Sequence, residues 1–175
     1  MALTRARLPA AEYAPFYAGY VAAVPAGETI DDALAGSLAA LAGWLEAQPP
    51  ARAAYAYAPG KWTAAQSLQH VIDTERIFTY RALSFARGEA AALPGFDQDA
   101  YAAAAPASAR ALTDLARELR VVRAATRALF ASLDDAALAR SGTMSGVAQS
   151  CRALGFVTAG HAYHHARLLR ERYGG

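Results

Sequence analysis

Three of the four histidines of this 175-residue chain lie close together near its C-terminal end. His161 and His165 stand four residues apart, so on a helix their side chains point the same way, with Cβ atoms about 5–6 Å apart. Metal–imidazole bonds are about 2.0–2.1 Å long, and one helical turn is the spacing at which two rings can bind the same ion. The pair therefore predicts a metal site, whereas His164 projects about 100° away from His165 and is expected at the rim.

The pair also lies on the side of its helix that is expected to face the core. Positions that step alternately by four and three residues form one stripe: Val147, Cys151, Leu154, Thr158, His161, His165 and Leu168. The two histidines thus take places where leucines would be expected. The alternative is a pair of ordinary histidines near a helix C-terminus, where the helix dipole favours a cation. A single H-x-x-x-H motif is compatible with both interpretations.

Composition indicates an all-α protein with a single domain, residues 1–175. The apolar fraction is 55%; alanine, the best helix former, supplies much of it, while β-branched residues are sparse. The formal net charge is only +2, and acidic and basic residues are interspersed. This pattern argues against binding to nucleic acid or to a membrane surface.

The sequence gives no clear signal for secretion or membrane insertion. A single cysteine excludes an intrachain disulfide, and no apolar run approaches the roughly 18 residues of a membrane span. The N-terminal arginines and alanines faintly resemble a signal peptide, but Pro9, Glu12 and Pro15 interrupt its apolar region. We therefore expect a soluble, cytoplasmic protein.

Apolar stripes and capping signals predict the helices that position the histidines. The predicted elements are a short helical lead-in over 1–28, helices over 30–48, 63–87 and 108–133, and a last helix with Ser145 as its N-cap. Thr29 is a cap for the first long helix, and Thr63 with Gln66 forms a capping box for the second. Four amphipathic helices favour a four-helix bundle, in which we expect no paired strands. The long connection 88–107 indicates a crossover or a function.

Three further residues each have a structural and a functional interpretation. His70 lies at the border of the apolar stripe of the second helix, where it is by itself a partly buried histidine; a bundle would bring it opposite the H-x-x-x-H pair, where it becomes the favoured third ligand. Glu75 lies on the apolar side of that helix and needs a partner, so a salt bridge to an arginine is favoured over support of a ligand histidine. Cys151 is favoured as a small core residue over a ligand.

Exposed positions are favoured for the remaining polar candidates. Tyr163 and His164 could line the mouth of the site, although solvated positions fit them better. Arg120, Arg123 and Arg127 share one helical flank, for which a solvated face is favoured over a phosphate site.

At these residues the chain resembles the DinB/YfiT-like superfamily of metalloenzymes. The resemblance covers nearly the whole chain and rests on four stretches: 57–63 (YAPGKWT), 70–78 (HVIDTERIF), 93–97 (LPGFD) and 160–165 (GHAYHH), the last followed by Glu171-Arg172-Tyr173. The superfamily consists of four-helix bundles with one histidine on the second helix and an H-x-x-x-H pair on the fourth. The resemblance implies His70, His161 and His165 as the ligands of one divalent metal ion.

The leading hypothesis is a metal-dependent enzyme of the thiol-dependent transferase or hydrolase type. Three histidine ligands leave one coordination position open, as in catalytic zinc sites; zinc or nickel is favoured, and iron or copper also fits such a site. The resemblance implies a low-molecular-weight thiol and a small electrophilic substrate as partners. The rival hypotheses are a non-catalytic metal-binding or stress-response bundle and a bundle without metal. We also expect a homodimer, because the many tyrosines suit an interface.

Overall fold

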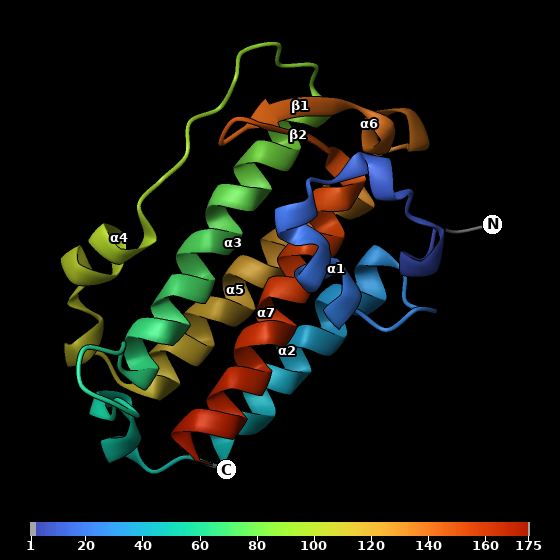
Figure 1. Ribbon diagram of the computed structural model, residues 1–175. Helices are drawn as coiled ribbons and strands as arrows, with labels where there is room; N and C mark the ends of the chain where they lie inside the picture. The colour runs from blue at the N-terminus through green and yellow to red at the C-terminus, as the bar shows by residue number, and fades with distance from the viewer. Residues whose placement is uncertain (1–2, 175) are drawn as a thin grey trace.

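The computed structural model describes residues 3–174, and its four long helices form a bundle (Figure 1). These helices are α2 (Ile30–Glu46), α3 (Ala64–Ala86), α5 (Leu112–Ala131) and α7 (Cys151–Tyr173). Each of α2 and α3 packs against both α5 and α7. The helix with three histidines, α7, therefore lies beside the helix with the fourth, α3. The predicted all-α class and four-helix bundle are confirmed.

The starts of α2 and α3 follow the capping signals of the sequence. Thr29 accepts a hydrogen bond from the backbone N–H of Asp32, and the Asp32 carboxylate accepts the Thr29 N–H in return. Thr63 and Gln66 form the same reciprocal pair at the start of α3. Gly88, with a φ of +82°, follows the end of α3 in the left-handed conformation that glycine favours. Each cap satisfies N–H groups that a helix end leaves unpaired.

The segment before α7 is a β-hairpin, which the sequence analysis did not predict. Strands β1 (Ser141–Met144) and β2 (Val147–Ser150) pair antiparallel. Ser145 and Gly146 connect them with φ angles of +50° and +78°, which are those of a type I′ turn. Our expectation that no strand pairs was therefore wrong, although these two short strands are the whole sheet of the described residues.

The predicted N-cap of the last helix was also wrong, because Ser145 occupies the hairpin turn. Ser150 caps α7 instead and accepts the backbone N–H of Ala153 at 3.0 Å. The third long helix begins at Leu112 and not at Ser108, since a 3-10 turn that starts at Pro106 precedes it. The ends of α2 and α5 each fall two residues before the predicted ones.

The N-terminal segment, for which a short helical lead-in was predicted, lies along the bundle (Figure 1). It consists of three 3-10 turns and one short helix: η1 (Arg5–Arg7), η2 (Ala10–Glu12), η3 (Pro15–Tyr17) and α1 (Ala18–Ala23). Helix α1 packs directly on α7. A Cβ atom at Gly160 would lie 1.9 Å from the carbonyl oxygen of Tyr20, so only glycine at this position permits the observed approach of the two helices.

The remaining connections carry short elements: η4 (Pro50–Ala54), α4 (Gln98–Ala104), η5 (Pro106–Ala109) and α6 (Asp135–Ala139). The long predicted connection 88–107 thus contains α4 and part of η5. Its first part reaches the hairpin, where the backbone N–H of Leu93 donates to the carbonyl of Thr143 at 2.9 Å. Within residues 3–174 no helix has both the length and the apolar character needed to cross a membrane.

One of the three arginines expected on a solvated face is buried. Arg123 on α5 is 0% exposed and lies between α2 and α3, where it pairs with Glu75 and donates to Ser37 Oγ at 2.7 Å. The prediction for Arg123 was wrong because the polar partners that bury it come from two other helices. Arg120 and Arg127 remain accessible to solvent, and each pairs with an acidic residue of α2.

Candidate metal centre

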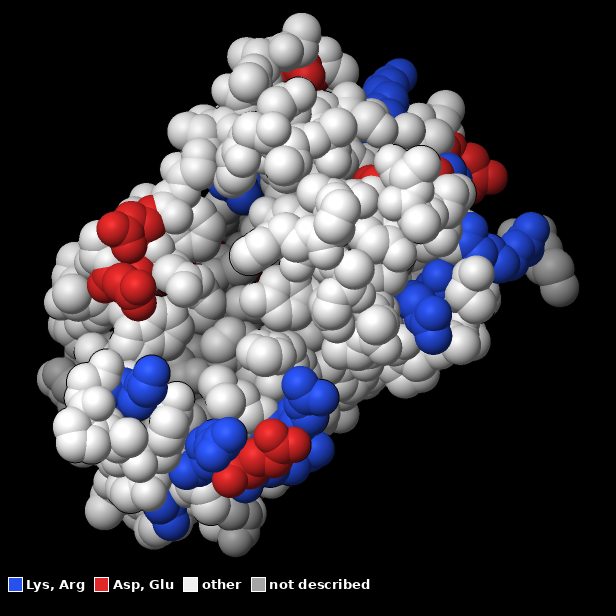
Figure 2. Space-filling model, viewed as in Figure 1, with Lys and Arg blue, Asp and Glu red and all other residues white. Residues whose placement is uncertain are grey.

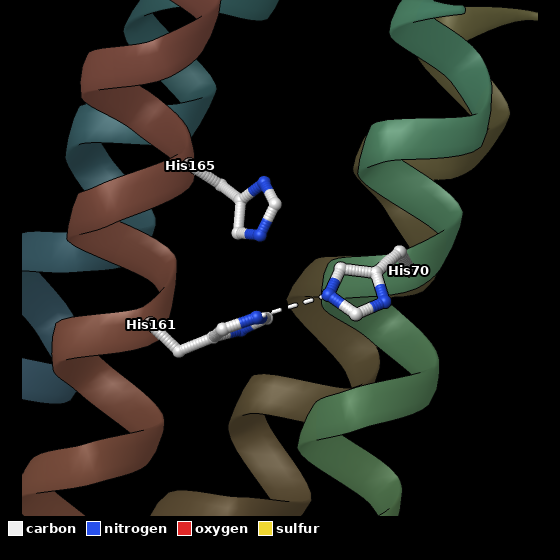
Figure 3. Close-up of side chains that lie close together, drawn as sticks. All are labelled: His70, His161 and His165. Carbon is white, nitrogen blue, oxygen red and sulfur yellow. Dashed lines mark hydrogen bonds between the residues drawn. The ribbon is translucent and has the colours of Figure 1, made fainter. Parts of the chain in front are cut away.

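His70 from α3 and His161 and His165 from α7 point toward one another in the interior of the bundle (Figure 3). Each offers one ring nitrogen, and these three atoms all lie within 4.8 Å of one another. The three side chains are 7%, 5% and 6% exposed, respectively. The structure therefore brings together the three histidines that the sequence analysis proposed as ligands of one ion.

The spacing of two of the ring nitrogens fits a small divalent ion. The Nε2 atoms of His70 and His161 lie 3.1 Å apart, as the dashed line in Figure 3 shows. Two imidazole nitrogens bound at about 2.05 Å to one tetrahedral ion would lie about 3.3 Å apart. This pair thus needs little adjustment to accept such an ion, and the third ring nitrogen lies within 4.8 Å of both.

Two hydroxyl groups contact histidine rings of the cluster at their Nδ1 atoms. The Oγ of Ser67 lies 3.2 Å from His165 Nδ1, and the Oγ1 of Thr74 lies 3.4 Å from His70 Nδ1. A hydrogen bond at one ring nitrogen fixes the orientation of the ring and leaves the other nitrogen free to bind a metal. In both histidines the hydroxyl contacts Nδ1, so Nε2 is the nitrogen that could bind a metal.

The surroundings keep the three rings neutral. Burial lowers the pKa of His70 to about 4. Burial also lowers the pKa values of His161 and His165 well below the ordinary value, and the proximity of the other rings adds to this effect because like charges repel. Neutral imidazole is the form that binds metal ions, so the site is ready for a metal at neutral pH.

His164 and Tyr163 lie outside this cluster. His164 is only half-buried, and its ring packs edge-on against Tyr20 and His165. The hydroxyl of Tyr163 donates to the carboxylate of Glu28 at 3.3 Å, on another side of α7. Neither side chain lines the two pockets that reach the histidines. His164 therefore takes no part in the cluster, but it is half-buried where a solvated position was favoured.

One pocket, here called the aromatic pocket, has a volume of about 440 Å³ and reaches His70 and His161. Its walls come from η3, α1, α3, the hairpin and the connection after α3, and they include the rings of Tyr17, Tyr20 and Phe78. Figure 2 shows a hollow on the face that α1 and α3 border, with uncharged atoms over most of its surroundings. A ligand that enters there meets mainly apolar surface before it reaches the histidines.

A second pocket, here called the C-terminal pocket, has a volume of about 530 Å³ and reaches His165. It lies between the connection after η4 and the end of α7, with Lys61 and Asp99 at its border. Trp62 also lines it and places its ring 4.8 Å from that of His70, centre to centre. The histidine cluster is therefore accessible from two sides.

The comparison with known families decides the family of the chain. The model of the DinB superfamily matches residues 33–169, which include all three clustered histidines. The chain belongs to the DinB superfamily. No curated protein matches it in sequence.

The fold of this DinB protein is similar to that of a solved bacterial structure. YfiT from Bacillus subtilis, a probable metal-dependent hydrolase with an unusual four-helix bundle topology, superimposes with a TM-score of 0.70. The match covers 82% of this chain and 85% of YfiT, at 20% sequence identity. At that identity the likeness shows a shared fold.

Two other candidate residues of this DinB protein, Glu75 and Cys151, have structural roles. The Glu75 carboxylate pairs with both Nε and Nη2 of Arg123, at 2.7 and 2.8 Å, which confirms the predicted salt bridge to an arginine. Cys151 is buried at the start of α7, where its thiol donates to the carbonyl of Ala82 and burial raises its pKa to about 12. It is the predicted core residue and takes no part in the histidine cluster.

The sequence analysis missed several residues that surround the histidines. Ser67 and Thr74 could have been found, because they lie on α3 within one turn of His70. Tyr20, whose ring lies 5.3 Å from that of His161, comes from the lead-in, and no local signal connects it with α7. Arg81 lies about three helical turns after His70, on the same face of α3, and lines the aromatic pocket.

Proposed function

We propose that this DinB protein is a divalent-metal-dependent enzyme whose ion is held by His70, His161 and His165. The observation that carries the proposal is the cluster itself: three buried, neutral imidazoles within 4.8 Å of one another, reached by two pockets. The reaction is hydrolysis of a small electrophilic substrate or transfer of a low-molecular-weight thiol to it. YfiT, whose fold is similar to that of this chain, is described as a probable metal-dependent hydrolase, which supports hydrolysis.

The residues around the cluster suit such chemistry. A divalent ion would act as a Lewis acid and lower the pKa of a water molecule or thiol bound to it. Ser67 and Thr74 orient the rings that would bind it. Tyr20 and Trp62 pack against His161 and His70 and cover the flanks of the cluster with apolar surface. Exclusion of water strengthens electrostatic interactions with the reacting groups.

The pockets favour an enzyme over an ion that only ties α3 to α7. Structural zinc sites are closed by four protein ligands, whereas catalytic sites have three and keep one position for water or substrate. Within the described residues the metal-ligating group has three members, and two of them line the aromatic pocket. The proposed ion is zinc or nickel; both accept imidazole nitrogen readily, as iron and copper also do.

Cobalt(II) substitution tests whether the site has an open position. Protein purified without a histidine tag is analysed for bound metal, the metal is then exchanged for cobalt, and the visible spectrum is recorded with and without cysteine as the thiol probe. A thiol that enters the open position changes the d–d bands and adds a sulfur-to-metal charge-transfer band. An unchanged spectrum would indicate a closed structural site and contradict the proposed enzyme.

A further inference from the structure

Arg81 is a buried arginine at the end of the aromatic pocket remote from the histidines. His70, Thr74, Phe78 and Arg81 follow one another on α3 in steps of four, four and three residues and all line this pocket. One face of α3 thus forms a continuous wall from the histidine cluster to Arg81. At 1.5 Å per residue, the Cα atoms of His70 and Arg81 lie about 16 Å apart along the helix axis.

The guanidinium of Arg81 has no acidic partner among residues 3–174. Arg81 is 3% exposed, yet none of the ion pairs of the described chain includes it. Its Nη2 donates to the carbonyl of Pro94 at 2.6 Å and to Ser145 Oγ at 3.2 Å, and its Nη1 donates to Met144 Sδ at 3.7 Å. An arginine has five N–H donors, so these bonds occupy three of them.

The other buried arginine of the bundle shows what is missing at Arg81. Arg123 has a carboxylate partner, Glu75, that neutralises its charge. A buried charge without such a partner is costly, and a carboxylate would neutralise it and accept from the donors that remain, Nε and one hydrogen of Nη1. Burial accordingly lowers the pKa of Arg81, and the nearby group that opposes this effect is the phenol of Tyr17.

We propose that Arg81 binds the carboxylate of an elongated organic substrate whose apolar body lies in the aromatic pocket and whose reactive end reaches the histidines. The guanidinium lies 5.9 Å from the ring centres of both Phe78 and Phe96, which offer apolar walls directly beside the charge. The pocket volume of about 440 Å³ suits a small molecule. The assignment of the reactive end rests on the proposed metal-dependent function, but recognition of the carboxylate by Arg81 does not.

Calorimetric titration with matched acids and amides tests this assignment. The probes are 3-phenylpropionate and 4-phenylbutyrate, each compared with its neutral amide, on the metal-loaded protein. The acids are expected to bind about tenfold or more tightly than the amides, because a hydrogen-bonded charge pair with Arg81 is available only to the acids. Arg81→Gln should abolish this preference, and Arg81→Lys should retain part of it, since lysine keeps the charge but not the planar set of donors. Arg87→Gln, an exposed change of the same charge at the end of α3, is the matched control and should bind as the wild type does.

Repetition with the metal-free protein separates Arg81 from the ion, because a carboxylate can also bind a metal. If Arg81 is the anion site, the preference for the acids persists without the ion. A preference that vanishes with the metal, or that survives in Arg81→Gln, would overturn the role of Arg81 and leave the proposed function intact. Failure of both acids to bind the wild-type protein would overturn it as well. Should Arg81→Gln not fold, the acid–amide comparison on the wild type and on Arg81→Lys still decides.

Discussion

The Nε2 atoms of His70 and His161 lie 3.1 Å apart, although 91 positions separate the two residues in the sequence. The contact exists because α3 and α7 are neighbours in the bundle and present these side chains to each other (Figure 3). Two buried rings at this distance cannot both carry a proton on both nitrogens without strong repulsion. The cluster is therefore built for neutral imidazole, and this property leads to a measurable dependence on pH.

The metal-free protein should lose stability as the pH falls from 6.5 toward 4. His70 has a pKa of about 4 in the folded state and 6.5 in the unfolded chain, so in this range the unfolded chain binds protons that the folded chain does not. By linkage, His70 alone makes the free energy of unfolding about 3 kcal/mol smaller near pH 4 than at neutral pH. Above pH 6.5 its contribution is fully present. Urea unfolding of chelator-treated protein at several pH values measures the slope.

A His70→Gln variant provides the comparison for this slope. The substitution removes the contribution of His70 to the pH dependence, so the free energy of unfolding of the variant should change less between pH 5 and 6.5. Carboxylates with lowered pKa values, such as those of Glu12 and Glu118, contribute mainly below this window. An equally steep slope in the variant would show that His70 is not held neutral by the fold.

Removal of one partner of the buried ion pair should destabilise the bundle strongly. Arg123→Met leaves the Glu75 carboxylate buried without its partner, and such changes cost about 3–5 kcal/mol. The double change of Glu75 and Arg123 to methionine should recover much of this loss, because no unpaired charge remains. Urea unfolding at fixed metal loading measures both effects.

The surface pair of Arg127 with Asp31 is the matched control for the buried one. Arg127→Met should change the free energy of unfolding by no more than about 1 kcal/mol, because exposed ion pairs contribute little. If Arg123→Met and Arg127→Met lower the free energy of unfolding equally, burial does not make the Glu75–Arg123 pair more important for stability than a surface pair.

A methyl group at position 160 should loosen the lead-in from α7. The Cβ of Gly160→Ala would collide with the backbone of Tyr20, and such overpacking costs roughly 1–3 kcal/mol. Tyr20 covers His161, so a chelator should also extract the metal faster. Gly43→Ala on α2 meets nothing within 4 Å and should be neutral or stabilising, by up to about 1 kcal/mol. Unchanged stability and metal release in Gly160→Ala would show that the contact with α1 is not tight.

Signals local to one helix were sufficient to predict the frame of the bundle. The capping residues Thr29 and Thr63 each act within a few residues, and α2 and α3 begin where they indicate. The stripe that carries His161 and His165 likewise predicted the helix α7, although not its start. The family resemblance and the bundle argument led to His70, and α3 presents it to α7 as expected.

Features that depend on distant partners could not be predicted in the same way. Arg123 looks like a surface residue until Glu75 of α3 and Ser37 of α2 enclose it. Ser145 is a good N-cap by type, but the Gly146 that follows it favours a hairpin turn, and the strands then displace the helix start to Cys151. Arg81 owes its place in the pocket to the connection and hairpin that fold over α3.

Metal affinity of single-histidine variants tests the central claim most directly. Zinc binding to tag-free protein is measured by competition with a chromophoric chelator for the wild type and for alanine variants at His70, His161, His165 and His164. We predict one ion per chain in the wild type, loss of most of the affinity in each of the first three variants, and wild-type affinity in His164→Ala, because only the first three rings converge on one point. Wild-type affinity in His70→Ala would show that α3 contributes no ligand and would contradict the three-histidine site.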